Sequence, residues 1–168
     1  MTYCYTEMNS PVGRLKLFAK DNQLSAIFWD NQDFAPLSVA AKKATAKDTV
    51  LREAKKQLQE YFAGKRTTFD LSLAPKGTDF QQQVWKALRK IAHGKTWSYS
   101  DIAKRIAKPN ASRAVGAAIG RNPLSIVVPC HRVIGANGKL TGFAGGLEKK
   151  AILLNLEGHE YFIAGDNA

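Results

Sequence analysis

Residues 100–120 read SDIAKRIAKPNASRAVGAAIG and contain two short helical patterns separated by turn-forming residues. Ser100 is a residue type that caps helices, so we expect the first helix to begin there. Pro109 and the asparagine after it favour a turn, and a second helix is expected over 113–120. Two short helices joined by a four-residue turn are typical of a helix-turn-helix, although many helical hairpins share this spacing without contacting DNA.

The second of these helices is almost bare of long side chains. Its middle consists of Gly116, Ala117 and another alanine, while Arg113 stands in its first turn. Proteins that read base edges in the major groove carry Asn, Gln, Arg or Lys along such a helix. The composition therefore fits either a close backbone approach to DNA with one projecting arginine or a helix packed tightly in a core, and the sequence leaves both open.

The basic charge of the chain is concentrated around these helices. The 168 residues include 25 Lys and Arg against 14 Asp and Glu, a formal net charge of +11. Residues 86–132 hold ten Lys and Arg and one acid, Asp101. A stretch of one sign indicates a polyanionic partner, most simply nucleic acid, whereas a surface that serves only solubility usually mixes both signs. An anionic membrane surface is the weaker alternative, because no helix pairs a basic face with a strongly apolar one.

Composition excludes several classes of protein. With 45% apolar and 10% aromatic residues, intrinsic disorder is not expected. No apolar run approaches the roughly 18 residues of a membrane span, and the opening residues do not resemble a secretory leader. The two cysteines, Cys4 and Cys130, are too few for a disulfide framework. We therefore expect a cytoplasmic protein without contact to a membrane.

The first 75 residues have the pattern of a small sheet with one helix. Apolar and polar residues alternate over 15–19, 23–29 and 69–73, which predicts three strands. Asp48 is expected to cap a helix that ends at Gly64.

From residue 76 onward the pattern is mainly helical. Thr78 and Gln81 form a capping box, and apolar residues then line one face of a helix as far as Ile91. We therefore predict an α+β protein with two domains, a sheet-plus-helix domain over 1–75 and a mostly helical domain with the helix-turn-helix over 76–168.

The segment that carries chemistry reads NPLSIVVPCHRVIG, residues 122–135. Residues 126–128 are expected to form a buried extended run that the following proline ends. Cys130 comes next and is followed by His131 and Arg132, whose charges are expected to lower the pKa of the thiol. Cys130 is therefore the candidate nucleophile, and an inert buried cysteine is the alternative.

The histidine beside Cys130 requires help from other groups to act as a base. Adjacent residues point their side chains in different directions, so a water is expected to bridge Cys130 and His131. Glu157, at the end of an expected helix over 148–157, is the candidate that fixes the tautomer of His131. The alternative is an exposed glutamate with no particular role.

The chain shows no pattern for a metal or a cofactor. Its three histidines and two distant cysteines do not have the spacing of metal ligands. The glycine-rich stretch GFAGG at 142–146 lacks the Lys and Ser/Thr of a phosphate-binding loop. This stretch fits a lid over a flat substrate or a plain surface loop.

Five quoted segments together resemble the O6-alkylguanine-DNA alkyltransferases, and the stand-alone bacterial enzymes most. They are PCHRV at 129–133, the preceding Asn-Pro at 122–123, GFAGG at 142–146, RAVGAA at 113–118 and FQQQVWKAL at 80–88. The likeness is strong over 78–158 and holds only in outline before that. It implies repair of DNA by direct reversal of damage, in which the protein acts once and needs no cofactor.

The resemblance implies how the protein meets DNA. The helix-turn-helix is expected to enter the minor groove of double-stranded DNA with weak sequence preference, and the protein is expected to be a monomer in solution. Arg113 is expected to fill the gap left by a flipped nucleotide. The other residues expected to contact DNA lie on the same helix: Ser112, Ala114, Gly116 and Ala117.

The resemblance also implies roles in the reaction. Cys130 is expected to accept the alkyl group, with His131 as a water-mediated base and Glu157 orienting it. Tyr99 is expected to donate a hydrogen bond to N3 of the departing guanine, and Asn122 to brace the turn before the cysteine.

A further set of residues is expected to hold the base. The carbonyl of Val133 is expected to accept a hydrogen bond from the exocyclic amine, and Phe143, Ala144 and Gly145 are expected to form the wall of the pocket. Relatives often carry Tyr in place of Phe143, and some carry Ser in place of Ala144. The less polar pocket fits larger alkyl groups or O4-alkylthymine. Residues that bind zinc in some relatives have no equivalents here, so we predict no metal.

Three other functions remain open on the sequence. A non-catalytic lesion-binding protein of the alkyltransferase-like kind would carry Trp in place of Cys130. A Cys-His hydrolase would leave the basic stretch without a role, and would need an oxyanion hole. A transcription factor fits the helix-turn-helix, but the bare second helix disfavours reading of base sequence.

Overall fold

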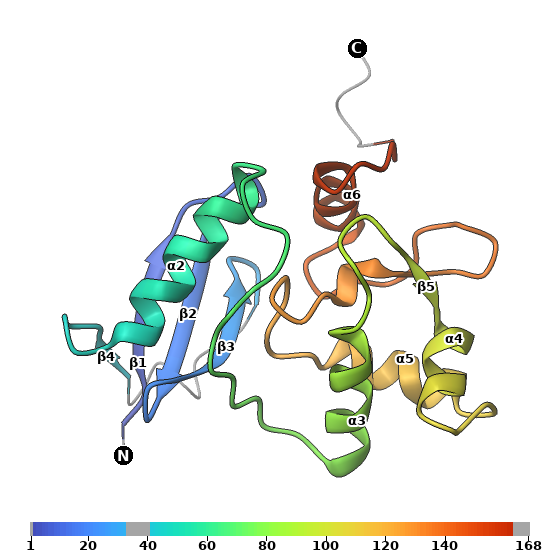
Figure 1. Ribbon diagram of the computed structural model, residues 1–168, viewed down its shortest axis with the longest axis horizontal. Helices are drawn as coiled ribbons and strands as arrows, with labels where there is room; N and C mark the ends of the chain where they lie inside the picture. The colour runs from blue at the N-terminus through green and yellow to red at the C-terminus, as the bar shows by residue number, and fades with distance from the viewer. Residues whose placement is uncertain (1, 33–40, 163–168) are drawn as a thin grey trace. The chain divides into compact units, whose positions relative to one another are not determined.

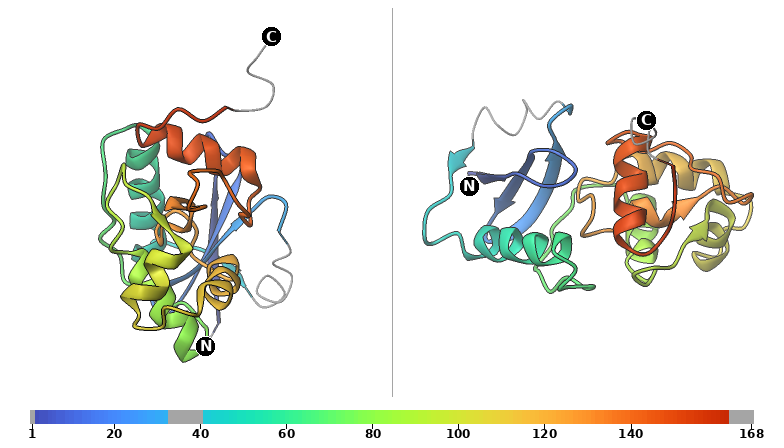
Figure 2. Two further views of the ribbon diagram at one scale, coloured as in Figure 1. Left: turned by 90° about the vertical axis from the view of Figure 1, so that its right-hand side faces the viewer. Right: turned by 90° about the horizontal axis from the view of Figure 1, so that it is seen from above.

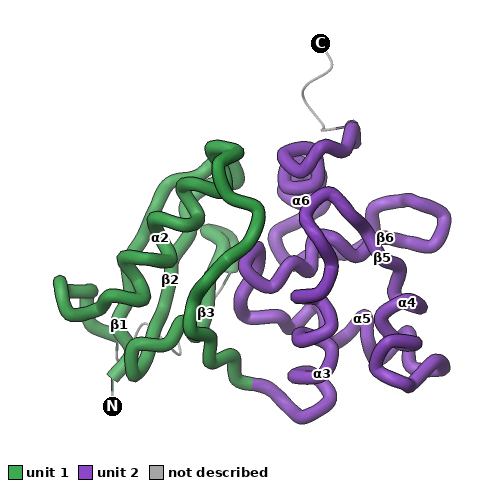
Figure 3. Tube along the Cα trace, viewed as in Figure 1, with its two compact units in different colours: residues 1–76 green, residues 77–168 purple. Residues whose placement is uncertain are grey.

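The computed structural model of the chain describes residues 2–32 and 41–162. These residues belong to two separately packed units, Met1–Lys76 and Gly77–Ala168 (Figure 3). Within the described residues the chain forms a four-stranded sheet, a two-stranded sheet and five α-helices. The α+β class predicted from the sequence is confirmed. No helix among these residues is long and apolar enough to cross a membrane.

The sheet of the first unit is built from three antiparallel strands and a short fourth one. The strands are β1 (Cys4–Met8), β2 (Leu15–Lys20), β3 (Gln23–Trp29) and β4 (Lys42–Lys43), in the spatial order β3-β2-β1-β4. Strands β1–β3 are antiparallel neighbours, and β4 lies parallel to β1. The alternation over 15–19 and 23–29 therefore predicted β2 and β3 correctly.

One helix, α2 (Thr49–Phe62), packs along a face of this sheet (Figures 1 and 2). It buries an apolar stripe with helical spacing that includes Leu51, Ala54 and Leu58. Asp48 precedes it without capping it, because its carboxylate instead accepts hydrogen bonds from the backbone N–H of Thr45 and the thiol of Cys4.

The strand predicted over 69–73 is absent, because backbone groups of this segment bind a side chain instead of a neighbouring strand. The amide of Gln57 donates to the carbonyl of Asp70 and accepts from its N–H, at 3.0 and 2.9 Å. Only Leu73 pairs with the sheet, through a single bridge to Leu24. A side chain that satisfies both backbone groups of one residue removes the need for a ladder partner there.

The second unit is mainly helical. Its helices are α3 (Asp79–Leu88), α4 (Tyr99–Arg105), α5 (Ser112–Gly120) and α6 (Leu147–Leu156), with a 3₁₀ turn η1 (Cys130–Arg132). Strands β5 (Trp97–Ser98) and β6 (Val133–Ile134) pair in parallel. Helices α3, α4 and α5 pack against one another, and α6 packs against η1 (Figure 1).

Two helices of this unit begin with a capping box, in which two side chains each accept a hydrogen bond from the other residue's backbone N–H. One helix begins where the sequence predicted, and the other does not. The box of Thr78 and Gln81 opens α3, as the sequence indicated. The start of α4 predicted at Ser100 is wrong, because Ser98 and Asp101 form the box there, at 3.1 and 2.8 Å. Ser98 is extended by its pairing in β5, which is the backbone geometry that a capping residue needs.

The segment 126–128 is buried, as predicted, but it is not extended. Ser125 and Val128 face each other across a bridge, and Ile126 adopts a φ of +76° in the turn between them. A β-branched residue rarely takes this left-handed conformation, so tertiary contacts must hold it there. The chain therefore makes a tight turn just before Cys130.

The position of the α4 cap can be tested by a pair of substitutions. Ser98→Ala removes the side chain that accepts from the N–H of Asp101 and should lower the free energy of unfolding by about 1 kcal/mol. Ser100→Ala should change it by less than about 0.5 kcal/mol, because Ser100 is exposed and makes only a 3.5 Å contact with Ser112. Urea titration measures both, and a larger cost at Ser100 would contradict the assignment.

Candidate active site

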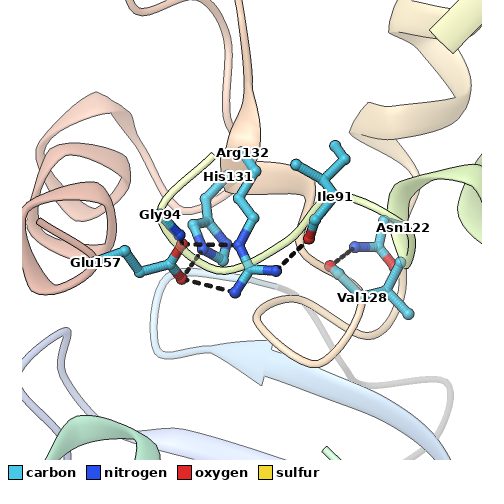
Figure 4. A network of polar contacts seen from close by, with 7 residues as sticks. All are labelled: Ile91, Gly94, Asn122, Val128, His131, Arg132 and Glu157. Atoms are coloured by element: carbon cyan, nitrogen blue, oxygen red, sulfur yellow. Dashed lines mark hydrogen bonds and ion pairs between the residues drawn. The ribbon is translucent and has the colours of Figure 1, made fainter. Parts of the chain in front are cut away.

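Asn122 holds the turn that leads to Cys130. Its amide nitrogen donates to the carbonyl of Val128 at 2.9 Å (Figure 4). Its amide oxygen accepts from the N–H of Leu124 at 3.0 Å. The side chain thus closes the loop in which Ile126 adopts its left-handed conformation. Asn122 is itself buried, so these bonds do not compete with solvent.

Cys130 lies at the wall of a pocket and is only 4% exposed. Burial raises the pKa of this thiol, whereas the side chains of Asn122 and Ser125 and the ammonium of Lys150 act in the opposite direction. The prediction that His131 and Arg132 would lower this pKa is wrong. Both side chains instead bind the carboxylate of Glu157.

The carboxylate of Glu157 is shared by a histidine and an arginine (Figure 4). One oxygen lies 2.7 Å from Nε2 of His131, and Nε of Arg132 donates to the other at 2.7 Å. The guanidinium makes a second bond to the carboxylate at 3.1 Å and donates to the carbonyl of Ile91 at 2.6 Å. The side chain of Glu157 is fully buried, so this residue is not the exposed glutamate of the alternative interpretation.

The surroundings of His131 determine its charge and its tautomer. Burial lowers the pKa of this histidine most strongly, the charges of Arg132 and Lys150 add to that effect, and Glu157 opposes it. The ring is therefore neutral near pH 7. Because a carboxylate only accepts hydrogen bonds, the proton sits on Nε2 and Nδ1 is left as a basic nitrogen. Among the described residues, no polar atom contacts Nδ1.

A pocket of about 380 Å³ opens beside Cys130. Several predicted site residues line it: Tyr99, Gly116, Asn122, Cys130, Phe143 and Ala144. The lining also includes residues that the sequence interpretation missed, namely Ile119, Gly120, Ser125 and Gly142. Most of these belong to α4, α5, the turn before η1 and the glycine-rich stretch, so segments from four parts of the unit meet around the thiol.

The remaining predicted residues are not among those that line this pocket. On α5, Arg113, Ala114 and Ala117 are exposed and Ser112 is half-buried. The other face of α5 packs in the core through Val115, Ala118 and Ile119. One face of this helix is therefore packed in the core, and contact of the exposed face with DNA stays a prediction. Val133 and Gly145 are buried.

Lys150 is a buried cation that sequence interpretation did not identify. It is 1% exposed and donates to the carbonyls of Val133 and Thr141, at 2.6 and 2.8 Å. Burial lowers its pKa to about 8. A signal was available, because Lys150 and Glu157 recur with Leu153 and Leu154 at the spacing of one helix face.

The second cysteine has a different environment. The thiol of Cys4 donates to Asp48 at 3.1 Å, and burial and this carboxylate raise its pKa to about 11. A thiol with such a pKa is a poor nucleophile near neutral pH. Across residues 2–32 and 41–162, no three His, Cys, Asp or Glu side chains gather closely enough to hold a metal ion.

Comparison with known proteins identifies the family. The model for the DNA-binding domain of 6-O-methylguanine DNA methyltransferase matches residues 79–159, and the model for the ribonuclease-like domain of the same enzyme matches residues 3–75. Together the two models span most of the chain. The chain belongs to the 6-O-methylguanine DNA methyltransferase family.

Individual members of the 6-O-methylguanine DNA methyltransferase family are similar over nearly the whole chain. The constitutive methylated-DNA–protein-cysteine methyltransferase of Bacillus subtilis is 48% identical over 159 residues, 94% of this chain and 96% of that protein. The crystal structure of Mycobacterium tuberculosis O6-methylguanine methyltransferase has a TM-score of 0.85 and 46% identity, and covers 93% of both chains. The structure of the same organism's OGT in complex with DNA has a TM-score of 0.84 and 44% identity, over 94% of this chain and 92% of that one.

The burial of neutral His131 predicts a dependence of stability on pH. Its pKa in the folded protein lies below the value of about 6.5 that it has in an unfolded chain. As the pH falls below 6.5, the unfolded chain therefore binds a proton that the folded chain does not, and stability is lost by at most about 1.4 kcal/mol per pH unit. Urea titrations between pH 7 and pH 5 should give a steeper loss for the native sequence than for His131→Gln. Parallel curves would contradict the assignment of a neutral buried ring.

Proposed function

We propose that the protein repairs DNA by moving the alkyl group of O6-alkylguanine to Cys130. The observation that carries the proposal is a single thiol in the wall of a 380 Å³ pocket, next to a histidine whose free nitrogen is basic. Membership of the 6-O-methylguanine DNA methyltransferase family supports it. So does the name methylated-DNA–protein-cysteine methyltransferase, which relatives similar over nearly the whole chain carry.

The thiol must lose its proton before it can attack. Since burial raises the pKa of Cys130, little thiolate exists in the empty pocket near pH 7. We expect a water to pass the proton of Cys130 to Nδ1 of His131, whose other nitrogen is held by Glu157 at 2.7 Å. Asn122, Ser125 and the ammonium of Lys150 then stabilise the negative sulfur.

The transfer itself exchanges one covalent bond for another. The sulfur of Cys130 forms a bond to the alkyl carbon, and the bond from that carbon to O6 breaks, leaving its electron pair on guanine. Tyr99 lines the pocket, and we expect it to donate to N3 of this anion while Asn122 keeps the cysteine turn in position. The product is a thioether, which has no easy hydrolytic exit, so each molecule acts once.

The flipped base needs a flat site with few polar groups. Phe143 and Ala144 line the pocket and bring no hydroxyl, and Gly145, which follows them in the chain, is buried. The carbonyl of Val133 is bound by Lys150 and keeps a second lone pair for the exocyclic amine of guanine. A wall of this composition also suits O4-alkylthymine and larger alkyl groups.

We expect α5 to contact DNA from the minor groove. The exposed residues Arg113, Ala114 and Ala117 leave a nearly flat helix face with one long side chain, and Ser112 and Gly116 adjoin it. Such a face suits close approach to the backbone rather than reading of bases, so sequence preference should be weak. The same proposal includes a monomeric, cytoplasmic protein that flips the damaged nucleotide and lets Arg113 occupy the gap.

Intact mass after reaction tests the chemistry. Mixed with a duplex that contains one O6-methylguanine, the protein should gain the mass of one CH₂ at Cys130 and then stop. Cys130→Ser should gain nothing, whereas Cys4→Ser should react like the native sequence. A duplex with O4-methylthymine tests the wider substrate range in the same assay. Tight binding without a mass gain would instead identify a non-catalytic lesion-binding protein.

Arg113→Ala tests the role of α5 in flipping. At saturating protein, this variant should repair a duplex lesion at least about tenfold more slowly, because no side chain supports the gap in the stack. Its reaction with free O6-benzylguanine should not change. Arg121→Ala, which removes an equal charge at the other end of α5, should retain the rate on saturated duplex. An equal loss on duplex and free base would contradict the flipping role.

A further inference from the structure

Two hydroxyl groups from distant parts of the chain meet beside the pocket. The phenol oxygen of Tyr99, at the start of α4, lies 2.7 Å from Oγ1 of Thr141, in the segment between β6 and α6. Either oxygen can be the donor in the free protein. Within the described part of the chain, neither hydroxyl has another polar partner. Thr141 itself does not line the pocket, so it reaches the substrate only through Tyr99.

The ring of Tyr99 is held in place independently of this contact. Its side chain lies over Gly116, where an added Cβ would be 3.7 Å from two ring carbons. The residue also follows directly on β5, which pairs with β6 through Trp97 and Val133. The phenol oxygen therefore has a fixed position relative to α5 and to the cysteine turn.

The main chain of Thr141 is held by the buried ammonium of Lys150. This ammonium donates to the carbonyl of Thr141 at 2.8 Å and to the carbonyl of Val133 at 2.6 Å. One side chain therefore fixes both the proposed acceptor for the base amine and the residue that contacts Tyr99. The 2.7 Å contact thus joins two positioned groups and does not depend on a freely moving loop.

We propose that Thr141 is a positioning residue for the alkyl transfer, and that its hydroxyl donates to the oxygen of Tyr99 while Tyr99 donates to N3 of guanine. The inference rests on the proposed function. N3 of guanine has a lone pair and no proton, so a bound base fixes Tyr99 as the donor toward it. The proton of Thr141 then points at the phenol oxygen. A hydroxyl that accepts a hydrogen bond is a stronger donor itself, because the two bonds polarise each other.

The effect appears when negative charge reaches the base. As the bond from the alkyl carbon to O6 breaks, the electron pair stays on guanine, and the Tyr99 proton moves to N3. The phenolate left behind is stabilised by the hydroxyl of Thr141 until a proton from water restores Tyr99. The proton that Cys130 lost to His131 returns to water in the same turnover, so protons balance.

A double-mutant cycle tests this role. Single-turnover transfer from a saturating duplex with one O6-methylguanine should be about fivefold to tenfold slower in Thr141→Val, which keeps the shape and loses the hydroxyl. Thr141→Ser, which keeps the hydroxyl, should remain within about twofold of the native rate. In a Tyr99→Phe background, Thr141→Val should have no further effect, because the two residues act as one unit.

The outcomes separate this inference from the proposed function. An equal loss from Thr141→Val with and without the hydroxyl of Tyr99 would indicate a merely structural role and overturn the proposal. A faster Thr141→Val variant would overturn it as well, since Thr141 would then compete with guanine for the Tyr99 proton. If the native protein transfers no methyl group to Cys130, the proposed function fails, and the role of Thr141 fails with it. Transfer at the native rate in Thr141→Val would overturn the role of Thr141 alone.

Discussion

Glu157 carries its charge at a position that water does not reach, and this requirement organises much of the C-terminal unit. A buried carboxylate is costly unless it is paired and hydrogen-bonded, and removing one partner of such a pair typically costs about 3–5 kcal/mol. Here the partners are His131 and Arg132, and Arg132 in turn binds the carbonyl of Ile91. The end of α6, the turn at Cys130 and the segment after α3 are thereby tied together, and the tautomer of His131 follows from the same contact.

Much of the fold follows from local patterns. The alternation over 23–29 predicts β3 to the residue, and the capping box at Thr78 marks the start of α3, because each signal depends on neighbours in the sequence. The start of α4 shows where such a signal becomes ambiguous. Ser98 and Ser100 are both good caps, and the pairing of β5 with β6, which joins residues far apart in the chain, decides between them.

The candidate site, too, could be predicted from the sequence only in part. Cys130, His131 and Glu157 can be found from residue types and order, but their electrostatics cannot. Adjacent charges predict an activated thiol, whereas His131 and Arg132 bind the carboxylate of Glu157, and burial raises the pKa of the thiol. The left-handed turn at Ile126 is equally hidden, because it is closed by hydrogen bonds from Asn122 and between Val128 and Leu124 that residue types alone do not indicate.

The buried face of α6 has a consequence for how that helix is oriented. Lys150 and Glu157 lie on this face with Leu153 and Leu154, and each charge meets a fixed partner: Lys150 two backbone carbonyls, Glu157 the side chains of His131 and Arg132. Apolar contacts tolerate small rotations, because one methyl group can replace another. The contacts of Lys150 and Glu157, which have opposite charges and lie seven positions apart, do not tolerate such a rotation. Rotation of α6 about its own axis would take both groups from their partners at once, so the hydrogen bonds of these two charged side chains determine the rotational setting of this helix.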